Sequence, residues 1–206
     1  MAVLQVAGLR FAFDGEPPLF DGLALRLEAG VHRLDGESGS GKTTLMKLLA
    51  GHLACTGQRV LNGLNAEAEP AAWRQSVAWV DARDPAFDEL TPEALMQRLR
   101  PEFPRFDTDA WQRHIDGFGL APHAFKTLYM MSTGMRRKAA LAVVLASGCP
   151  LLLLDEPTAG LDAPSTAWLV AALNAWGQAP ERAALVVLGT WPEALHCNGT
   201  IGLPGP

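Results

Sequence analysis

The stretch GESGSGKT, residues 36–43, decides the fold of this chain. It follows a short apolar run at residues 31–34 that is typical of a strand, and residues 42–49 have the apolar spacing of a helix. A glycine-rich loop between a strand and a helix turns successive backbone N–H groups inward, and the helix N-terminus adds partial positive charge. The stretch therefore predicts a loop that holds the phosphates of a nucleoside triphosphate.

Two side chains at the end of this loop are expected to act directly on the phosphates and the metal. Lys42 is expected to reach the β- and γ-phosphates, and the Thr43 hydroxyl is expected to bind Mg²⁺. The whole loop is expected to contact the nucleotide. Its predicted binding residues are Gly36, Glu37, Ser38, Gly39, Ser40, Gly41, Lys42, Thr43 and Thr44.

The second half of the site lies far along the chain, where four leucines at residues 151–154 precede Asp155 and Glu156. A continuous apolar run predicts a buried strand, whose C-terminal end is expected beside the phosphate loop. Asp155 can hold Mg²⁺ there through its water shell, and Glu156 can polarise the attacking water as a general base. We therefore expect Thr43 and Asp155 to bind the metal, and Lys42 and Glu156 to be catalytic.

Strand and helix patterns alternate on both sides of a different middle region. Alternating or apolar runs predict strands at residues 3–6, 9–13, 23–27, 31–34, 77–80, 151–154 and 184–188. Helical patterns occupy residues 42–49, 134–147 and 163–176. Between residues 82 and 131 strand signals are absent, and the segments 91–99, 108–117 and 122–127 look helical. Buried strands separated by helices indicate a mostly parallel sheet.

These patterns predict an α/β fold: a P-loop NTPase core with a mostly parallel sheet, an N-terminal antiparallel β portion and an inserted all-helical subdomain. We expect one domain over residues 1–206. Residues 1–82 and 132–206 form its nucleotide-binding core, and residues 83–131 form the helical subdomain. The Pro/Gly-rich end, residues 202–206, is expected to be a frayed tail.

Composition narrows the function. The 206 residues suffice for one sizeable domain, and a net charge of −5 with His neutral argues against a nucleic-acid-binding protein. Cys55, Cys149 and Cys197 are widely spaced, so we expect three small buried side chains in a reducing compartment. Residues 1–9 lack the features of a signal peptide, and no apolar run approaches the roughly 18 residues of a membrane span.

Two further motifs point to a family. The run MSTGM at residues 131–135, followed by RRK and a helical stretch, resembles the signature of ATP-binding cassette (ABC) proteins in the form common among small exporter ATPases. The run PTAGLD at residues 157–162 looks like the D-loop that follows the catalytic glutamate in that family. Order and spacing agree over essentially the whole chain, which is identified as a member of the ABC ATPases.

The resemblance implies a dimer in which two subunits face head to tail and each signature closes the ATP site of the other. Ser132 and Gly134 are then expected to donate to a phosphate, and Asp162 of the D-loop is expected to belong to the same nucleotide site. The family also places an aromatic residue before the phosphate loop to stack on adenine. Phe13 is the first candidate and Phe11 the second. ATP and Mg²⁺ are the implied cofactors, in a homodimer or a heterodimer.

Two residues depart from the family pattern. Where the family normally has a glutamine that senses the γ-phosphate, Mg²⁺ and the attacking water, this chain has Ala82, and Asp81 or Arg83 is a partial substitute to be tested. Where the family usually has a switch histidine, the chain has Trp191, which offers one N–H donor and no proton transfer. Because ATP and Mg²⁺ binding groups remain, we expect good ATP binding with slow hydrolysis, or work beside a more complete partner. His196 is expected in a helix at the surface.

The leading functional expectation is an ATPase subunit, peripheral on the cytoplasmic face of the cell membrane, that drives a separate transmembrane permease subunit. An exporter is favoured over an importer, and the cargo is left open. Trp111, Phe103 and Phe106 are candidates for the docking surface, with core packing as the favoured role. The alternatives are a degenerate ATP-sensing regulatory subunit and a non-transport ABC ATPase.

Overall fold

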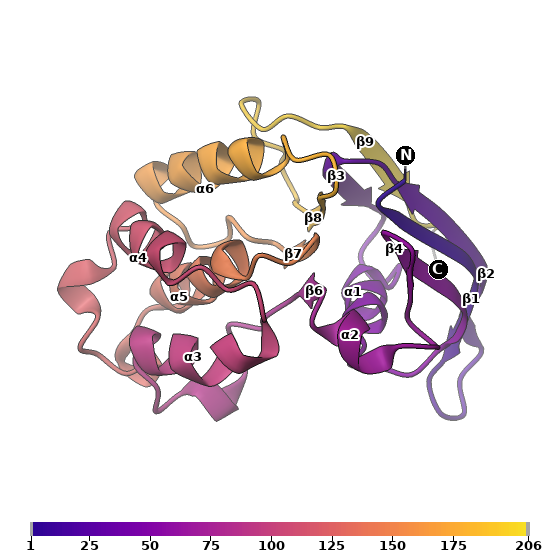
Figure 1. Ribbon diagram of the computed structural model, residues 1–206, viewed down its shortest axis with the longest axis horizontal. Helices are drawn as coiled ribbons and strands as arrows, with labels where there is room; N and C mark the ends of the chain where they lie inside the picture. The colour runs from indigo at the N-terminus through magenta and orange to yellow at the C-terminus, as the bar shows by residue number, and fades with distance from the viewer. Residues whose placement is uncertain (1, 205–206) are drawn as a thin grey trace.

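A five-stranded parallel sheet runs through the middle of the molecule (Figure 1). The computed structural model describes residues 2–204. Each neighbouring pair in the sheet is parallel, as the apolar runs predicted. In spatial order the strands are β6 (Val77–Ala78), β7 (Leu151–Asp155), β8 (Ala183–Val187), β3 (Gly30–Asp35) and β9 (Gly199–Gly202).

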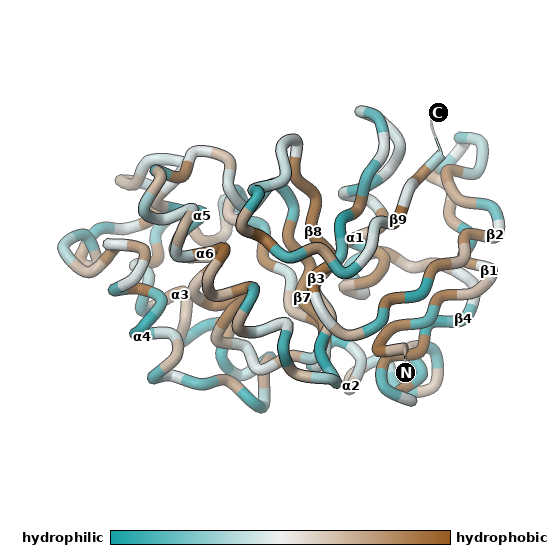
Figure 2. Tube along the Cα trace, turned by 90° about the horizontal axis from the view of Figure 1, so that it is seen from above, coloured by the Kyte–Doolittle hydropathy of each residue, from teal (hydrophilic) through white to brown (hydrophobic). Residues whose placement is uncertain are grey.

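Strand β7 shows why its sequence is apolar at every position. Leu151 and Leu153 belong to one apolar core, beneath the helix that follows the phosphate loop. Leu152 and Leu154 point to the opposite face and belong to a second core. Because both faces of the sheet are covered, consecutive side chains are buried, and the central strands are brown along their length in Figure 2.

The N-terminal part forms a separate antiparallel sheet. Its strands, in spatial order, are β2 (Pro18–Leu27), β1 (Leu4–Ala12), β4 (Thr56–Leu61) and β5 (Leu64–Asn65). The two strands expected at residues 3–6 and 9–13 are one strand. Gly8 has φ 63 and lies where the register shifts, so the alternation breaks while the pairing continues. Strands β4, β5 and β9 were not expected from the sequence.

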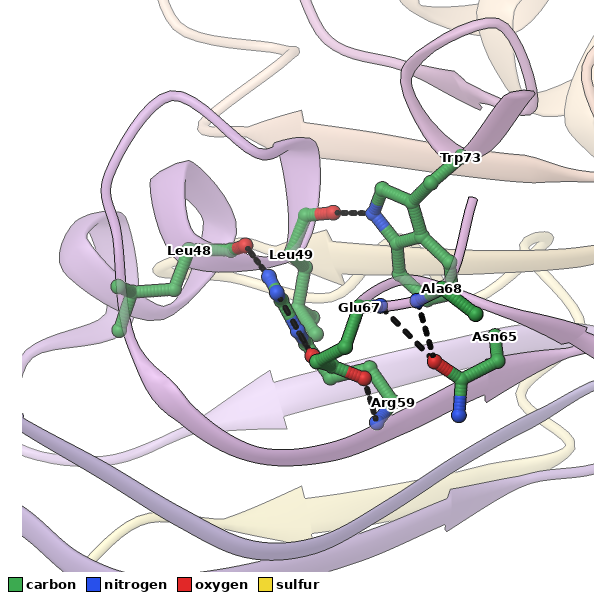
Figure 3. Close-up of polar contacts among 7 residues, drawn as sticks. All are labelled: Leu48, Leu49, Arg59, Asn65, Glu67, Ala68 and Trp73. Atoms are coloured by element: carbon green, nitrogen blue, oxygen red, sulfur yellow. Dashed lines mark hydrogen bonds and ion pairs between the residues drawn. The ribbon is translucent and has the colours of Figure 1, made fainter. Parts of the chain in front are cut away.

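Helix α1 (Lys42–Ala50) carries the phosphate loop at its N-terminus, and two side chains fix its other end. Arg59 Nη1 donates to the carbonyl of Leu48 at 2.7 Å, and Trp73 Nε1 donates to that of Leu49 at 2.7 Å (Figure 3). Trp73 comes from the short helix α2 (Pro70–Arg74), and Arg59 is also paired with Glu67 at 2.9 Å. Two of the last carbonyls of α1, those of Leu48 and Leu49, are therefore bonded by side chains from β4 and α2.

Four helices gather at the opposite side of the central sheet from α1 (Figure 1). They are α3 (Pro92–Leu99), α4 (Thr108–Gly117), α5 (Thr133–Ala146) and α6 (Ala163–Trp176). A short 3-10 turn precedes α3 at Pro85–Phe87, and others lie between α3 and α4 at Arg100–Glu102 and between α4 and α5 at Ala121–His123 and Leu128–Met130. The helix expected at residues 122–127 is wrong, because the backbone there makes i→i+3 bonds, from Ala124 N to Ala121 O and from Lys126 N to His123 O. The division at residues 83–131 stays a prediction.

Three smaller expectations need correction. Gly202 is the last residue of β9 and Leu203 is buried, so the expected tail is wrong for both, while residues 205 and 206 lie outside the described part. Cys149 is buried, and burial raises the pKa of its thiol to about 11, whereas Cys197 is exposed. His196 lies in an irregular segment and not in a helix, though its side chain is exposed.

Of the helices in the described part of the chain, none is long and apolar enough to cross a bilayer.

Candidate functional site

The phosphate loop leaves β3 at Asp35 and enters α1 at Lys42. The N-cap, Gly41, has φ 90, and an added Cβ would lie 2.9 Å from the Phe20 ring, so conformation and space both require glycine. No side chain caps the first turn of α1. Its backbone N–H groups are therefore directed into the loop, in the arrangement that binds an anion.

Lys42 crosses the mouth of this loop. Its ammonium donates to the carbonyl oxygens of Gly36 at 2.6 Å and Glu37 at 2.7 Å. These bonds hold a full positive charge within the ring of backbone N–H groups. The charge and the N–H groups together suit the oxygens of a phosphate chain.

Thr43 and Asp155 meet although they are far apart in sequence. The Thr43 hydroxyl donates to Asp155 Oδ2 at 2.6 Å, which places the end of β7 against the start of α1. A hydroxyl and a carboxylate are the oxygen donors that suit Mg²⁺, which keeps several waters and uses few protein ligands. Within residues 2–204 there is no group of three or more His, Cys, Asp or Glu residues placed to hold a metal. The pair thus fits Mg²⁺ shared with a nucleotide.

Glu156 has an unusual backbone. Its φ is 47, in the left-handed region that residues other than glycine rarely adopt. Its N–H donates to the carbonyl of Val187 at 3.0 Å, and its Oε2 accepts from the N–H of Gly189 at 3.3 Å. The end of β8 and the backbone just after it therefore hold Glu156 beside the Thr43–Asp155 pair.

These groups line one open pocket of about 550 Å³. Phe13 contributes its ring to the wall, is 50% exposed and meets Phe11 edge-on with centroids 4.9 Å apart. Phe11 is less exposed and packs against the apolar core that contains Leu151 and Leu153. Phe13, not Phe11, is thus available to a planar ligand. The lining residues are Phe13, Leu19, Ser38, Gly39, Gly41, Lys42, Thr43, Thr44, Asp155, Glu156 and Val187.

Ser132 and Gly134 do not line that pocket. Ser132 is exposed and caps α5 by accepting from the N–H of Met135 at 3.2 Å. Gly134 has a structural reason to be glycine, since an added Cβ would lie 2.1 Å from the carbonyl oxygen of Gly160. The start of α5 and the loop after Glu156 therefore touch backbone to backbone.

The Asp162 carboxylate has two partners within this chain. Its carboxylate accepts from the N–H of Ser165 at 2.8 Å, which caps α6, and pairs with the buried ammonium of Lys138 at 2.7 Å. The bonds from Lys138 and Ser165 hold the pKa of this carboxyl well below its usual range. Asp162 also lies outside the residues that line the pocket, so within this chain it joins α5 to α6.

The two replaced positions offer no free donor. Trp191 Nε1 donates to the carbonyl of Leu195 at 2.9 Å, and the ring packs against the core. Ala82 presents a methyl group to a cavity behind Asp155 and Glu156. Asp81 and Arg83, the suggested substitutes, are paired with each other at 3.2 Å.

Sequence reasoning missed one residue. Arg137 projects from α5 and donates from Nη1 to the carbonyl of Ala159, three residues after Glu156. Only its place in the basic run at residues 136–138 was noted, and that run gave no sign of where each side chain points.

Comparison with known proteins places this geometry in a family. The model of the family described as ABC transporter matches residues 20–159. The ATP-binding/permease protein Rv1747 of Mycobacterium tuberculosis is 35% identical over 167 residues, 77% of this chain and 19% of that protein. This chain therefore spans only about a fifth of that relative's length.

Two relatives of similar size are named as transport ATP-binding proteins. The cytochrome c biogenesis ATP-binding export protein CcmA of Pseudomonas savastanoi is 36% identical over 168 residues, 81% of this chain and 78% of that protein. The nickel import ATP-binding protein NikO of Rhodobacter capsulatus is 35% identical over 186 residues, 82% of this chain and 72% of that protein.

A solved structure, described as the ATP-binding subunit of an ABC transporter, confirms the fold. It superimposes with a TM-score of 0.85 at 20% identity, over 98% of this chain and 85% of that one. The chain belongs to the ABC transporter family, as an ATP-binding subunit with the family's ATPase activity.

Proposed function

We propose that the chain binds Mg-ATP at the phosphate loop and hydrolyses it with Glu156 as the general base. The observation that carries this proposal is the 2.6 Å contact between the Thr43 hydroxyl and the Asp155 carboxylate, which brings two oxygen ligands for Mg²⁺ beside Lys42. Mg²⁺ held there would supply charge neutralisation on the β- and γ-phosphate oxygens. Lys42 adds its positive charge from the loop, and Phe13 offers its exposed ring to adenine.

Hydrolysis by this site is slow. Water attacks the γ-phosphorus, Glu156 accepts a proton from that water, and ADP leaves. The charge that develops on the γ-phosphate is stabilised by donors aimed at it, and one missing donor costs about 3 kcal/mol, or about a hundredfold in rate. Ala82 has no donor, and the single N–H of the Trp191 ring is bonded to the Leu195 carbonyl.

The active form is a head-to-tail dimer, as a homodimer or a heterodimer. Ser132 is exposed at the start of α5 and lies outside the pocket at this chain's own phosphate loop. The first turn of a helix is a natural anion site, so a second subunit is the reasonable source of the phosphate. Asp162 takes part through the loop that Gly134 touches.

A separate membrane subunit is the proposed partner. Trp111 and Phe103, two of the three suggested docking residues, are buried, and Phe106 packs against the core, which supports the favoured core role. The connection between α4 and α5 instead exposes Phe125, Tyr129 and Met130, at 75, 72 and 58%. Exposed large apolar side chains close together in sequence mark a contact surface. We place the partner there, with the chain peripheral on the cytoplasmic membrane face.

Export is the proposed direction, because the family resemblance is to small exporter ATPases and one relative is named an export protein. The relative named for nickel import has the opposite direction. The second candidate is an ATP-sensing subunit with little hydrolysis, which the occupied N–H of Trp191 favours.

Sedimentation of the Glu156→Gln variant tests the proposal. With Mg-ATP, this variant should sediment as a dimer, because it keeps every binding group and loses the general base. Adding Ser132→Arg should leave ATP binding intact and abolish the dimer. A variant that binds ATP tightly and remains a monomer at all protein concentrations would overturn the dimer. Dimerisation of the wild type without phosphate release would establish the sensor.

A further inference from the structure

A cavity of about 270 Å³ lies behind the two acidic residues that end β7. Asp155 and Glu156 form one wall, the segment from residue 79 to residue 83 forms a second, and α5 forms the third. Ala82 contributes only a methyl group to this space. No side chain at position 82 therefore reaches from the helical side of the cavity to the acidic residues.

Arg137 enters the same cavity from α5. Its Nη1 donates to the carbonyl of Ala159, and an added Cβ on Gly160 would lie 3.9 Å from that atom. A guanidinium keeps its charge at every working pH and presents its donors in a rigid plane. Arg137 thus holds the loop that follows Glu156 with a fixed, charged group.

Charges of both signs lie around Arg137. Burial and the nearby Arg83 lower the pKa of the guanidinium, and the carboxylates of Asp155, Glu156 and Asp81 oppose that change. Arg83 is paired with Asp81 at the rim of the cavity. Asp155 and Glu156 therefore partly offset the burial of the Arg137 charge and its repulsion by Arg83.

The turn that Arg137 holds also determines the place of Glu156. The N–H of Ala159 donates to the carbonyl of Glu156 at 3.1 Å, so the same residue is bonded to Glu156 on one side and to Arg137 on the other. The left-handed backbone of Glu156, with φ 47, is strained and persists only where surrounding bonds impose it. Arg137 supplies one of these bonds.

We propose that Arg137 is a positioning residue for hydrolysis, which fixes Glu156 through the Ala159 turn and links α5 to the acidic residues across the cavity to which Ala82 contributes only a methyl group. The inference rests on the proposed function of Glu156 as general base. Arg137 does not touch the reacting atoms in this account. It therefore affects the rate of the chemical step and not the binding of ATP.

Steady-state phosphate release with Mg-ATP tests this inference in five proteins: the wild type, Arg137→Gln, Arg137→Lys, Ala82→Gln and the double variant Ala82→Gln/Arg137→Gln. We expect Arg137→Gln to lower kcat about tenfold, with KM changed by less than about twofold. Arg137→Lys keeps the charge and should recover part of the loss. In the Ala82→Gln background the loss should shrink to less than about threefold, because two residues that serve one link are not additive.

Arg136→Gln is the matched control. Arg136 is the next residue on α5, is also anchored, to Asp88 at 2.6 Å and to the carbonyl of Ala82 at 3.1 Å, and does not touch the turn after Glu156. Its kcat should stay within about twofold of the wild type, since no bond of the catalytic turn is lost. If Arg137→Gln fails to fold, Arg137→Lys decides, with an expected threefold or larger loss of kcat, on the order of a weakened hydrogen bond.

Three results would overturn this inference and leave the proposed function standing. The first is an unchanged kcat in Arg137→Gln, or in Arg137→Lys if Arg137→Gln does not fold. The second is a KM that rises as much as kcat falls, and the third is an equally large loss of kcat when Ala82→Gln is also present. A wild type that releases phosphate no faster than Glu156→Gln would overturn the proposed hydrolysis, and this inference with it.

Discussion

The two halves of the nucleotide site differ in how much of their chemistry is present. In the half built on the phosphate loop, Lys42 is bonded to two loop carbonyls and Thr43 to Asp155. The half that would face the γ-phosphate has Ala82, which has no side-chain donor, and Trp191, whose only side-chain N–H donates to the carbonyl of Leu195. In the proposed function, holding a nucleotide and accelerating its hydrolysis therefore belong to different parts of the molecule.

This difference teaches that binding and rate can be changed separately. Interactions made equally with bound ATP and with the transition state set affinity, whereas donors that gain strength only as charge develops set the rate. Substitutions in the phosphate-loop half should therefore change ATP affinity. Substitutions around Ala82, Trp191 and Arg137 should change turnover.

The largest expected effect is on binding. Lys42→Ala removes the charge held in the phosphate loop and should weaken Mg-ATP binding about a hundredfold, or about 3 kcal/mol, the value of a strong charge-assisted bond. Isothermal titration calorimetry measures this change. Lys47→Ala, on the last turn of the same helix, is the control and should leave affinity unchanged. Equal affinity in wild type and Lys42→Ala would contradict the claim that the phosphate-loop half of the site sets ATP affinity.

The second effect is on stability, and it tests whether Gly134 is required for packing within the chain. Gly134→Ala should lower the free energy of unfolding by about 2 kcal/mol, because its Cβ would lie 2.1 Å from the carbonyl of Gly160. Without that contact, alanine in a helix would stabilise by up to about 1 kcal/mol, so the sign is decisive. Urea unfolding measures it. Gly202→Ala, whose Cβ would meet nothing within 4 Å, should cost little.

A smaller effect is expected from the ring at the rim of the pocket. Phe13→Ala should weaken ATP binding about tenfold, or about 1.4 kcal/mol, which is the usual value of one base–aromatic stack. Phe13→Trp should keep the affinity. Competition with a fluorescent ATP analogue reports both. Phe125→Ala removes a ring that is more exposed, at 75% against 50%, and that lies outside the pocket, so it serves as control; a loss as large there would contradict the role of Phe13.

The smallest effect is a pH dependence outside the site. Burial, and then the charge of Arg113, lowers the pKa of His114 to about 4, and its Nδ1 accepts from Trp168 Nε1 at 3.3 Å. Between this value and the unfolded pKa of about 6.5, the unfolded chain binds more protons. Stability should therefore fall as pH drops through this window, by on the order of 1 kcal/mol from pH 7 to pH 5 after allowing for partial exposure.

Urea unfolding at several pH values checks this slope. His114→Asn keeps an acceptor for Trp168 and should flatten the curve between pH 5 and pH 7. His196→Asn, at an exposed position, should leave the slope of the wild type. An unaltered slope in His114→Asn would assign the effect to other groups.

Much of the fold could be predicted because its patterns are local. Helix α4 begins at Thr108 after the capping Asp107, and β7 is an uninterrupted apolar run. Strand β9 could not be predicted, because Gly199–Gly202 is polar and glycine-rich, and only pairing with β3 makes it a strand. The sequence likewise gave no sign of the bulge at Gly8 that joins two expected strands into one.

The candidate site divides in the same way. The phosphate loop, Asp155 and Glu156 occupy the ends of regular elements, so the order of those elements was enough to bring them together. The direction of a side chain on a packed helix is set by tertiary contacts that sequence spacing does not report. For this reason the occupied N–H of Trp191, the capping role of Asp162 and the bond from Arg137 to Ala159 appear only in the structure.

Phosphate release at saturating Mg-ATP by the double variant Ala82→Gln/Trp191→His, compared with the wild type and with Glu156→Gln as background, tests the central claim most directly. The account predicts release at least about tenfold faster than that of the wild type, with ATP affinity unchanged, because donors are restored only in the half that lacks them. A wild type that already releases phosphate as fast as the double variant would contradict it.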